Sequence, residues 1–167
     1  MNDTSTLSAV AVATASARAM LAGEKRPDLL HDEVLAEILA ASVASRGGHP
    51  ALVDAGRRLS YDQLWALAGR QARGLALAGI GPGDMVGLWM PRGIDLLVAQ
   101  IAITRCGAAW VPFDAEAPVE RIATCLADAA AKGLVTTPDW QGRAAGTGCL
   151  VLTPDTLLAS DDGVAMP

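Results

Sequence analysis

The sequence predicts an α/β fold, with a mostly parallel sheet that is covered by helices on both faces. Short apolar runs, which suit buried strands, alternate along the chain with longer runs of helical periodicity. Turns that contain glycine or proline separate the two kinds of run. This alternation is typical of parallel strands that are joined by right-handed helical crossovers.

Composition narrows the classes of function. Of the 167 residues, 51% are hydrophobic and 19% are charged, which argues against extensive disorder. The formal net charge is −5, whereas a protein that binds nucleic acid needs a basic face. The longest run without charge, residues 4–17, is shorter than the roughly 20 apolar residues that span a bilayer. We therefore expect neither nucleic acid nor a membrane as a partner.

The N-terminal residues 1–27 are rich in alanine and are expected to form a flexible arm. Asp3, and the lack of a basic residue at the start, argue against a secretory signal. Over residues 29–44, apolar side chains recur at helical spacing with acidic residues on the opposite side, which predicts the first helix. Gly47 and Gly48 are expected to end it. The apolar positions are Leu30, Val34, Leu35, Ile38, Leu39 and Val43.

A short strand is predicted over residues 51–53, with a turn through residues 54–56. Ser60 is then expected to begin the second helix, which runs to Gly79. Gln63 stands three residues after Ser60, which is the spacing of a capping box. In that motif each of the two side chains bonds to the backbone N–H of the other residue.

The segment 79–84 is rich in glycine, as phosphate-binding loops are. Such a loop follows a strand and begins a helix, so that helical N–H groups meet the phosphate. Here the segment follows a helix and leads into a strand predicted over residues 85–89. It is therefore interpreted as a helix-to-strand connection.

The next elements continue the alternation. A helix is predicted from Ile94 to Gly107, and a strand over residues 109–113. Pro118 suits the first turn of a further helix, which is expected to reach Gly133.

Two more strands are predicted near the C-terminal end, over residues 134–136 and 150–152. The glycine-rich run between them, residues 142–148, predicts a flexible surface loop. Residues 28–153 are thus expected to form one α/β subdomain and residues 154–167 a linker.

The histidines and cysteines offer no obvious catalytic or metal site. The three cysteines, at positions 106, 125 and 149, lie too far apart for a disulfide scaffold or a Cys-x-x-Cys zinc site. They are expected to be reduced, which favours a cytoplasmic location. His31 lies beside acidic residues and His49 precedes a proline, and both are interpreted as surface residues.

Four segments in order resemble adenylation domains of nonribosomal peptide synthetases, which are members of the acyl-adenylate-forming, AMP-binding enzymes. Residues 59–64 resemble their first core motif, and residues 104–114 resemble the second. Residues 79–88 match the usual connection between the two motifs, and residues 117–122 match the start of the following helix. The resemblance covers roughly residues 30–137.

A fifth segment refines the resemblance, and four positions depart from it. Residues 91–97 resemble the poly-amino-acid synthetase branch. Residues 104–106 replace the usual Leu-Lys-Ala, and Trp110 replaces a tyrosine. These exchanges roughly preserve size and charge class, so the fold expectation stands.

The resemblance implies that this chain is the incomplete N-terminal subdomain of a larger enzyme. The parent would join an amino acid to ATP, release pyrophosphate and pass the aminoacyl group to the phosphopantetheine thiol of a carrier protein. The family's phosphate loop, magnesium ligand, amino-acid pocket and catalytic lysine would lie beyond Pro167. We therefore expect no catalytic, cofactor-binding or metal-binding residue in this chain. ATP and Mg²⁺ are implied only for the parent, whose partners would be the rest of the adenylation domain and the carrier protein.

Two other functions remain open from the residues. The chain could be a free-standing, non-catalytic module that binds a partner through an open sheet edge. It could also be a small nucleotide-binding protein. A reading frame that continues past Pro167 into a Thr-Ser-Gly-rich loop would support the adenylation domain. A stop codon at that point would support the free-standing module. ATP binding by the isolated chain would support the small nucleotide-binding protein.

Overall fold

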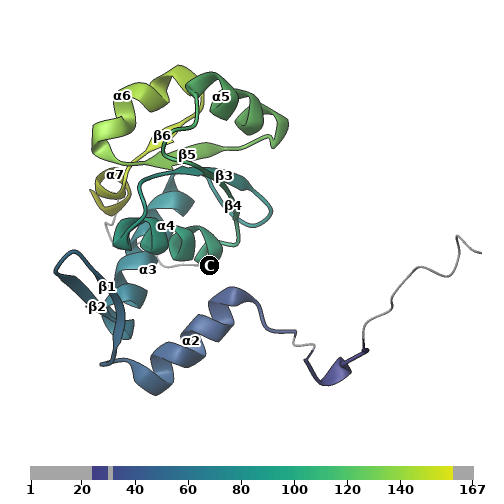
Figure 1. Ribbon diagram of the computed structural model, residues 1–167, viewed down its shortest axis with the longest axis vertical. Helices are drawn as coiled ribbons and strands as arrows, with labels where there is room; N and C mark the ends of the chain where they lie inside the picture. Colours follow the sequence, from purple (N-terminus) through teal and green to yellow (C-terminus); the bar gives the residue numbers. More distant parts are fainter. Residues whose placement is uncertain (1–23, 30–31, 160–167) are drawn as a thin grey trace, which may run out of the picture. The chain divides into compact units, whose positions relative to one another are not determined.

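A computed structural model of the chain describes residues 24–29 and 32–159 (Figure 1). The chain divides into two units, residues 1–32 and residues 33–167. In the first, the described part is a 3₁₀ turn, Pro27–Leu29, beside an ion pair of 2.6 Å between Arg26 and Asp28. Most of the expected N-terminal arm and His31 lie outside the described residues.

The first long helix, α2 (Leu35–Arg46), is shorter than predicted. It begins where the Glu37 carboxylate accepts a hydrogen bond of 3.0 Å from the Val34 N–H, and it ends before Gly47, as expected. Part of the predicted apolar stripe is not covered, since half of the Ile38 side chain is exposed.

The strand predicted at residues 51–53 is present, but it does not join the parallel sheet as the alternation of strands and helices had suggested. Strand β1 (Pro50–Asp54) instead pairs with β2 (Arg57–Ser60) in an antiparallel, two-stranded sheet. Ala55 and Gly56 between the two strands both have positive φ angles, as a type I′ hairpin turn requires. The hairpin escaped prediction because β2 begins with two arginines.

Helix α3 (Tyr61–Leu77) follows directly and has the predicted capping box. The Gln63 N–H donates to Ser60 Oγ at 3.2 Å, and the Ser60 N–H donates to Gln63 Oε1 at 2.9 Å. Two of the N–H groups that lack a partner within the first turn of the helix are thereby satisfied.

Ser60→Ala is expected to lower the free energy of unfolding by about 1 kcal/mol, because the cap acceptor is lost. Urea denaturation measures the change. Ser45→Ala is the matched control, since its hydroxyl donates only to carbonyls within α2. An equal loss in both variants would contradict a capping role for Ser60.

The main sheet is parallel and has the strand order β4-β3-β5-β6. Its strands are β3 (Met85–Trp89), β4 (Ala109–Phe113), β5 (Gly133–Thr136) and β6 (Val151–Leu152). Helices α3 and α4 (Ile94–Arg105) lie on one face, and α5 (Val119–Asp128) lies on the other (Figure 1). The predicted parallel sheet with helices on both faces is confirmed.

Each face of the sheet has its own hydrophobic core, because side chains alternate along the strands. Val86 and Leu88 of β3 pack in the cluster beneath α3 and α4. Trp89 packs in the cluster beneath α5, together with Ile122 and Leu126. Both faces of the central strands are therefore buried.

The C-terminal segments are more ordered than predicted. The stretch between β5 and β6, which includes the glycine-rich run, forms a 3₁₀ turn (Pro138–Trp140), helix α6 (Gln141–Ala144) and another 3₁₀ turn (Ala145–Thr147). The expected linker begins with helix α7 (Pro154–Ala159). Leu157 of α7 is buried against α3, where Gly74 leaves no room for a Cβ.

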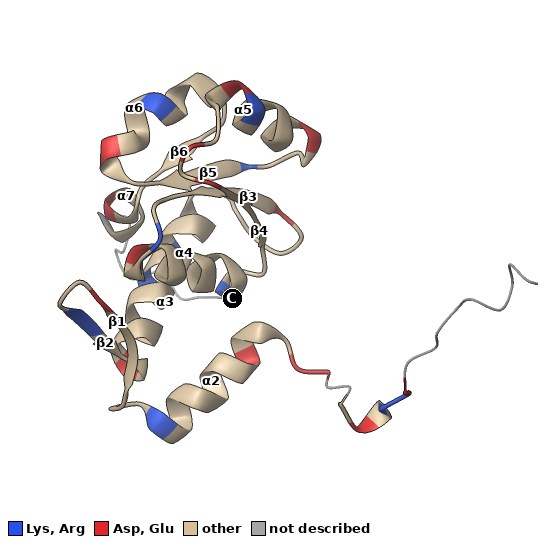
Figure 2. Ribbon diagram, viewed as in Figure 1, with Lys and Arg blue, Asp and Glu red and all other residues tan. Residues whose placement is uncertain are grey.

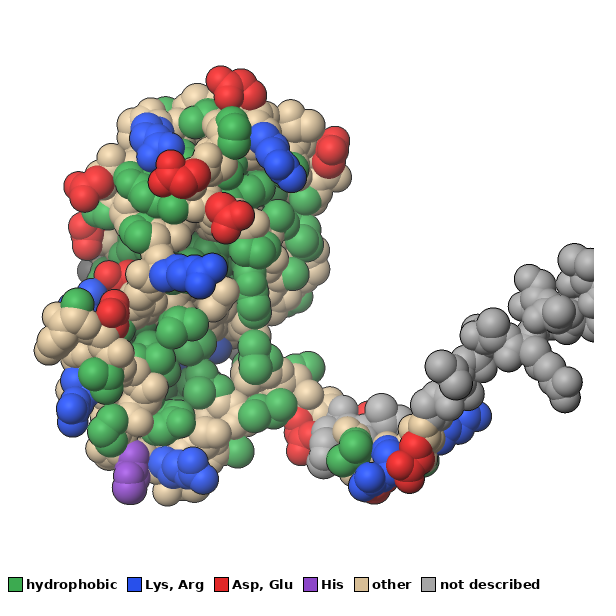
Figure 3. All heavy atoms as spheres, viewed as in Figure 1, with side chains coloured by type: hydrophobic (Ala, Val, Ile, Leu, Met, Phe, Trp, Pro, Cys, Tyr) green, Lys and Arg blue, Asp and Glu red, His purple; other side chains and the backbone are tan. Residues whose placement is uncertain are grey.

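The charged side chains are distributed without segregation of sign. Acidic and basic residues are interspersed along the described ribbon (Figure 2), and both border apolar side chains on the face in view (Figure 3). Within the described residues, no helix is long and apolar enough to cross a membrane.

Candidate functional site

The best candidate site lies where β3 and β4 end. The chain leaves β3 for α4 on one face of the sheet, and leaves β4 for α5 on the other face. The two connections therefore diverge, and a crevice opens between them. In open α/β sheets, ligands bind in such crevices at the carboxyl ends of the strands.

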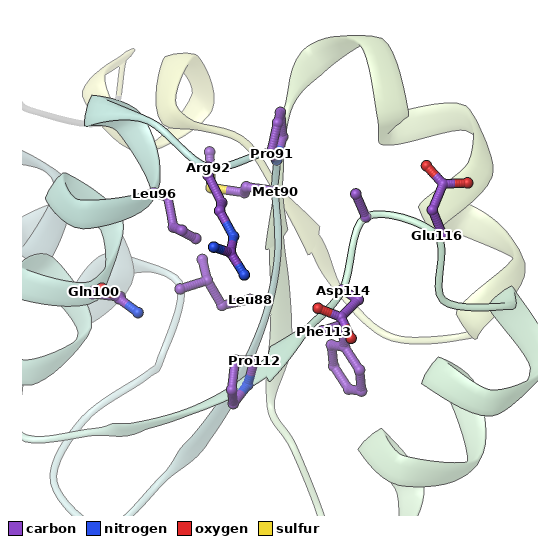
Figure 4. A pocket seen from close by; sticks show the side chains of 11 residues that line it. Leu88, Met90, Pro91, Arg92, Leu96, Gln100, Pro112, Phe113, Asp114 and Glu116 are labelled. Atoms are coloured by element: carbon purple, nitrogen blue, oxygen red, sulfur yellow. The ribbon is translucent and has the colours of Figure 1, made fainter. Parts of the chain in front are cut away.

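A hollow of about 790 Å³ occupies this place (Figure 4). Its apolar wall comes from β3, β4 and α4, and includes Leu88, Leu96 and Phe113. Arg92 projects from the connection after β3, whereas Asp114 and Glu116 belong to the connection after β4. Side chains of opposite charge thus face the hollow from its two sides.

The hollow carries charged groups that can bind a ligand. The exposed guanidinium of Arg92 can bind an anion, and the carboxylates of Asp114 and Glu116 can accept hydrogen bonds. Its described lining residues include no serine, cysteine, histidine or lysine, so the ionisable side chains of this lining are Arg92, Asp114 and Glu116.

Trp89 holds the ends of three strands together beside the hollow. Its indole N–H donates to the Asp114 carbonyl at 2.9 Å, and its carbonyl accepts a bond of 2.7 Å from the Thr136 hydroxyl. The Trp140 ring lies 5.1 Å from the Trp89 ring, and the Arg143 guanidinium lies 4.7 Å above it. These contacts fix the backbone position of Asp114.

Residues in the segment 104–114 also make structural contacts. The Arg105 guanidinium lies 3.5 Å from the centre of the Trp65 ring and donates to the Trp65 carbonyl. Burial lowers the pKa of Arg105. Gly107 has a φ of 79°, and its carbonyl accepts a bond of 3.1 Å from the Gly83 N–H. Arg105 therefore joins α4 to α3, and Gly107 joins the segment to the connection that precedes β3.

The segment 79–84 is a connection between α3 and β3, as predicted. Its Gly81 N–H donates to the Asp84 carboxylate at 2.9 Å, and this bond lowers the pKa of Asp84. Lys132 adds an ion pair of 3.4 Å with Asp84. Because the Gly81 and Gly83 amides already have acceptors, this loop does not fit a phosphate.

The cysteines and histidines do not assemble a site in the described part of the chain. All three cysteines are free, and burial raises the pKa of the Cys106 thiol. His49 is exposed. Among residues 24–29 and 32–159, no three His, Cys, Asp or Glu side chains gather to hold a metal ion.

The sequence had not singled out Arg92, Asp114 or Glu116. Their positions in the sequence were a signal for a site, because Arg92 and Asp114 closely follow two strands that were predicted correctly. Their meeting depended on β3 and β4 being neighbours, which the order of elements alone does not establish.

Comparison with known proteins places the chain in a family. The model of the AMP-binding enzyme family matches residues 39–163. Delta-poly-L-ornithine synthetase of Acinetobacter baumannii is 48% identical over 121 residues, which are 72% of this chain and 9% of that protein. Novobiocin biosynthesis protein H of Streptomyces niveus is 40% identical over 113 residues, which are 67% of this chain and 19% of that protein. The chain thus spans less than a fifth of these relatives.

Solved structures have the same fold. The N-terminal subdomain of Klebsiella oxytoca NpsA aligns with a TM-score of 0.70 and 23% identity, over 81% of this chain and 35% of that one. The nonribosomal peptide synthetase FmoA3, in a form bound to alpha-methyl-L-serine-AMP, aligns with a TM-score of 0.69 and 31% identity. That alignment covers 81% of this chain and 15% of FmoA3.

Proposed function

The chain belongs to the AMP-binding enzyme family, and on that premise we propose that it serves as the N-terminal scaffold of an amino-acid-activating adenylation domain. The observation that carries the proposal is 48% identity to a poly-ornithine synthetase over most of this chain but only 9% of that protein. The chain would supply the first parallel sheet and its helices.

The proposed parent enzyme joins the carboxylate of an amino acid to the α-phosphate of ATP and releases pyrophosphate. The aminoacyl group then passes to the phosphopantetheine thiol of a carrier protein. The similarity to a poly-ornithine synthetase supports an amino acid as the substrate, and supports the poly-amino-acid branch within the family.

The described residues do not fit ATP or Mg²⁺ by themselves. The glycine-rich connection has its Gly81 and Gly83 amides engaged, and no cluster of metal ligands is found in the described ranges. We therefore assign nucleotide and metal binding to the part of the parent that would follow Pro167. Its partners would be that downstream part and, for the whole enzyme, a carrier protein. The three free cysteines support a cytoplasmic location.

The outer edge of β4 argues against the alternative of a free-standing module that binds a strand of a partner protein at this sheet edge. The Ala109 N–H donates to Asp84 on the β3 side, so the backbone groups of Trp110 and Pro112 face outwards. Pro112 has no N–H to donate, which makes this edge a poor template for another strand.

The isolated chain is expected to show no micromolar affinity for ATP and no amino-acid-dependent pyrophosphate exchange. The physical reason is that the Gly81 and Gly83 amides of its glycine-rich connection already donate to acceptors of this chain. Isothermal calorimetry with ATP and an exchange assay measure this. Micromolar binding would instead support the small nucleotide-binding protein.

Co-purification tests the proposal itself. The polypeptide encoded directly after Pro167 is co-expressed with a tagged form of this chain, and a soluble complex is expected. A stop codon after Pro167, or a stable monomer that ignores its downstream partner, would contradict the proposal and favour the free-standing module.

A further inference from the structure

We draw no further inference here: the strongest candidate, the groove of about 340 Å³ between strand β1 and the start of helix α4, is lined by exposed apolar side chains such as Val53 and Leu97, but nothing in the described part of the structure shows what covers it.

Discussion

Trp89→Ala is expected to lower the free energy of unfolding by about 3–5 kcal/mol, which is the range for removing a large buried ring. Trp89 is fully buried at the end of β3, and its indole N–H donates to the Asp114 carbonyl. The substitution leaves a cavity beneath α5 and leaves that carbonyl without its donor. Urea denaturation followed by circular dichroism measures the loss.

Trp110→Ala is the matched control, because it removes the same ring from a half-buried position on the edge strand β4. We expect a clearly smaller loss of stability, in proportion to the smaller buried area. Equal losses in the two variants would contradict the central place of Trp89 at the ends of β3, β4 and β5.

Local signals predicted several elements well. Strands β3 and β4 coincide with the predicted residues 85–89 and 109–113, since each is a short apolar run that follows a glycine-containing turn. The Ser60 and Gln63 pair located the start of α3 to the residue. In these places, backbone preference and burial favour the same structure.

Elements that depend on distant partners were predicted less well. Helix α7 is ordered by the burial of Leu157 against α3, a contact across some eighty residues that no local pattern reveals. The glycine-rich run after β5 folds into short helices, because Trp140 packs beside Trp89 and Arg143 lies above that ring. The β1–β2 hairpin was missed because arginines occupy its second strand.

In the candidate site too, local features could be predicted from the sequence, whereas features that depend on distant partners could not. Arg92 and Asp114 could be placed after their strands from the sequence. That they face one hollow follows from the strand order β4-β3-β5-β6, in which β3 and β4 are neighbours and their following helices diverge. The strand order is determined by crossover packing over the whole subdomain, so the short-range pattern could not establish it.

The largest expected effect concerns activity. The 167-residue chain, co-expressed with the polypeptide encoded directly downstream, is expected to acquire amino-acid-dependent ATP–pyrophosphate exchange that neither part shows alone. The chain would complete the sheet and its helices, and the downstream part would bring the nucleotide, metal and amino-acid sites. Proximity and orientation of bound groups account for much of enzymatic rate, so an incomplete domain should lose nearly all of it.

This exchange assay tests most directly the claim that the chain is the N-terminal scaffold of an adenylation domain. The amino-acid panel should include ornithine, because a poly-ornithine synthetase is 48% identical to this chain. Each polypeptide alone, at the same concentration, is the control. We expect exchange by the complex, dependent on one amino acid or a few, and only background exchange by either part. Full exchange by the downstream polypeptide alone, or none by a soluble complex with any amino acid, would contradict it.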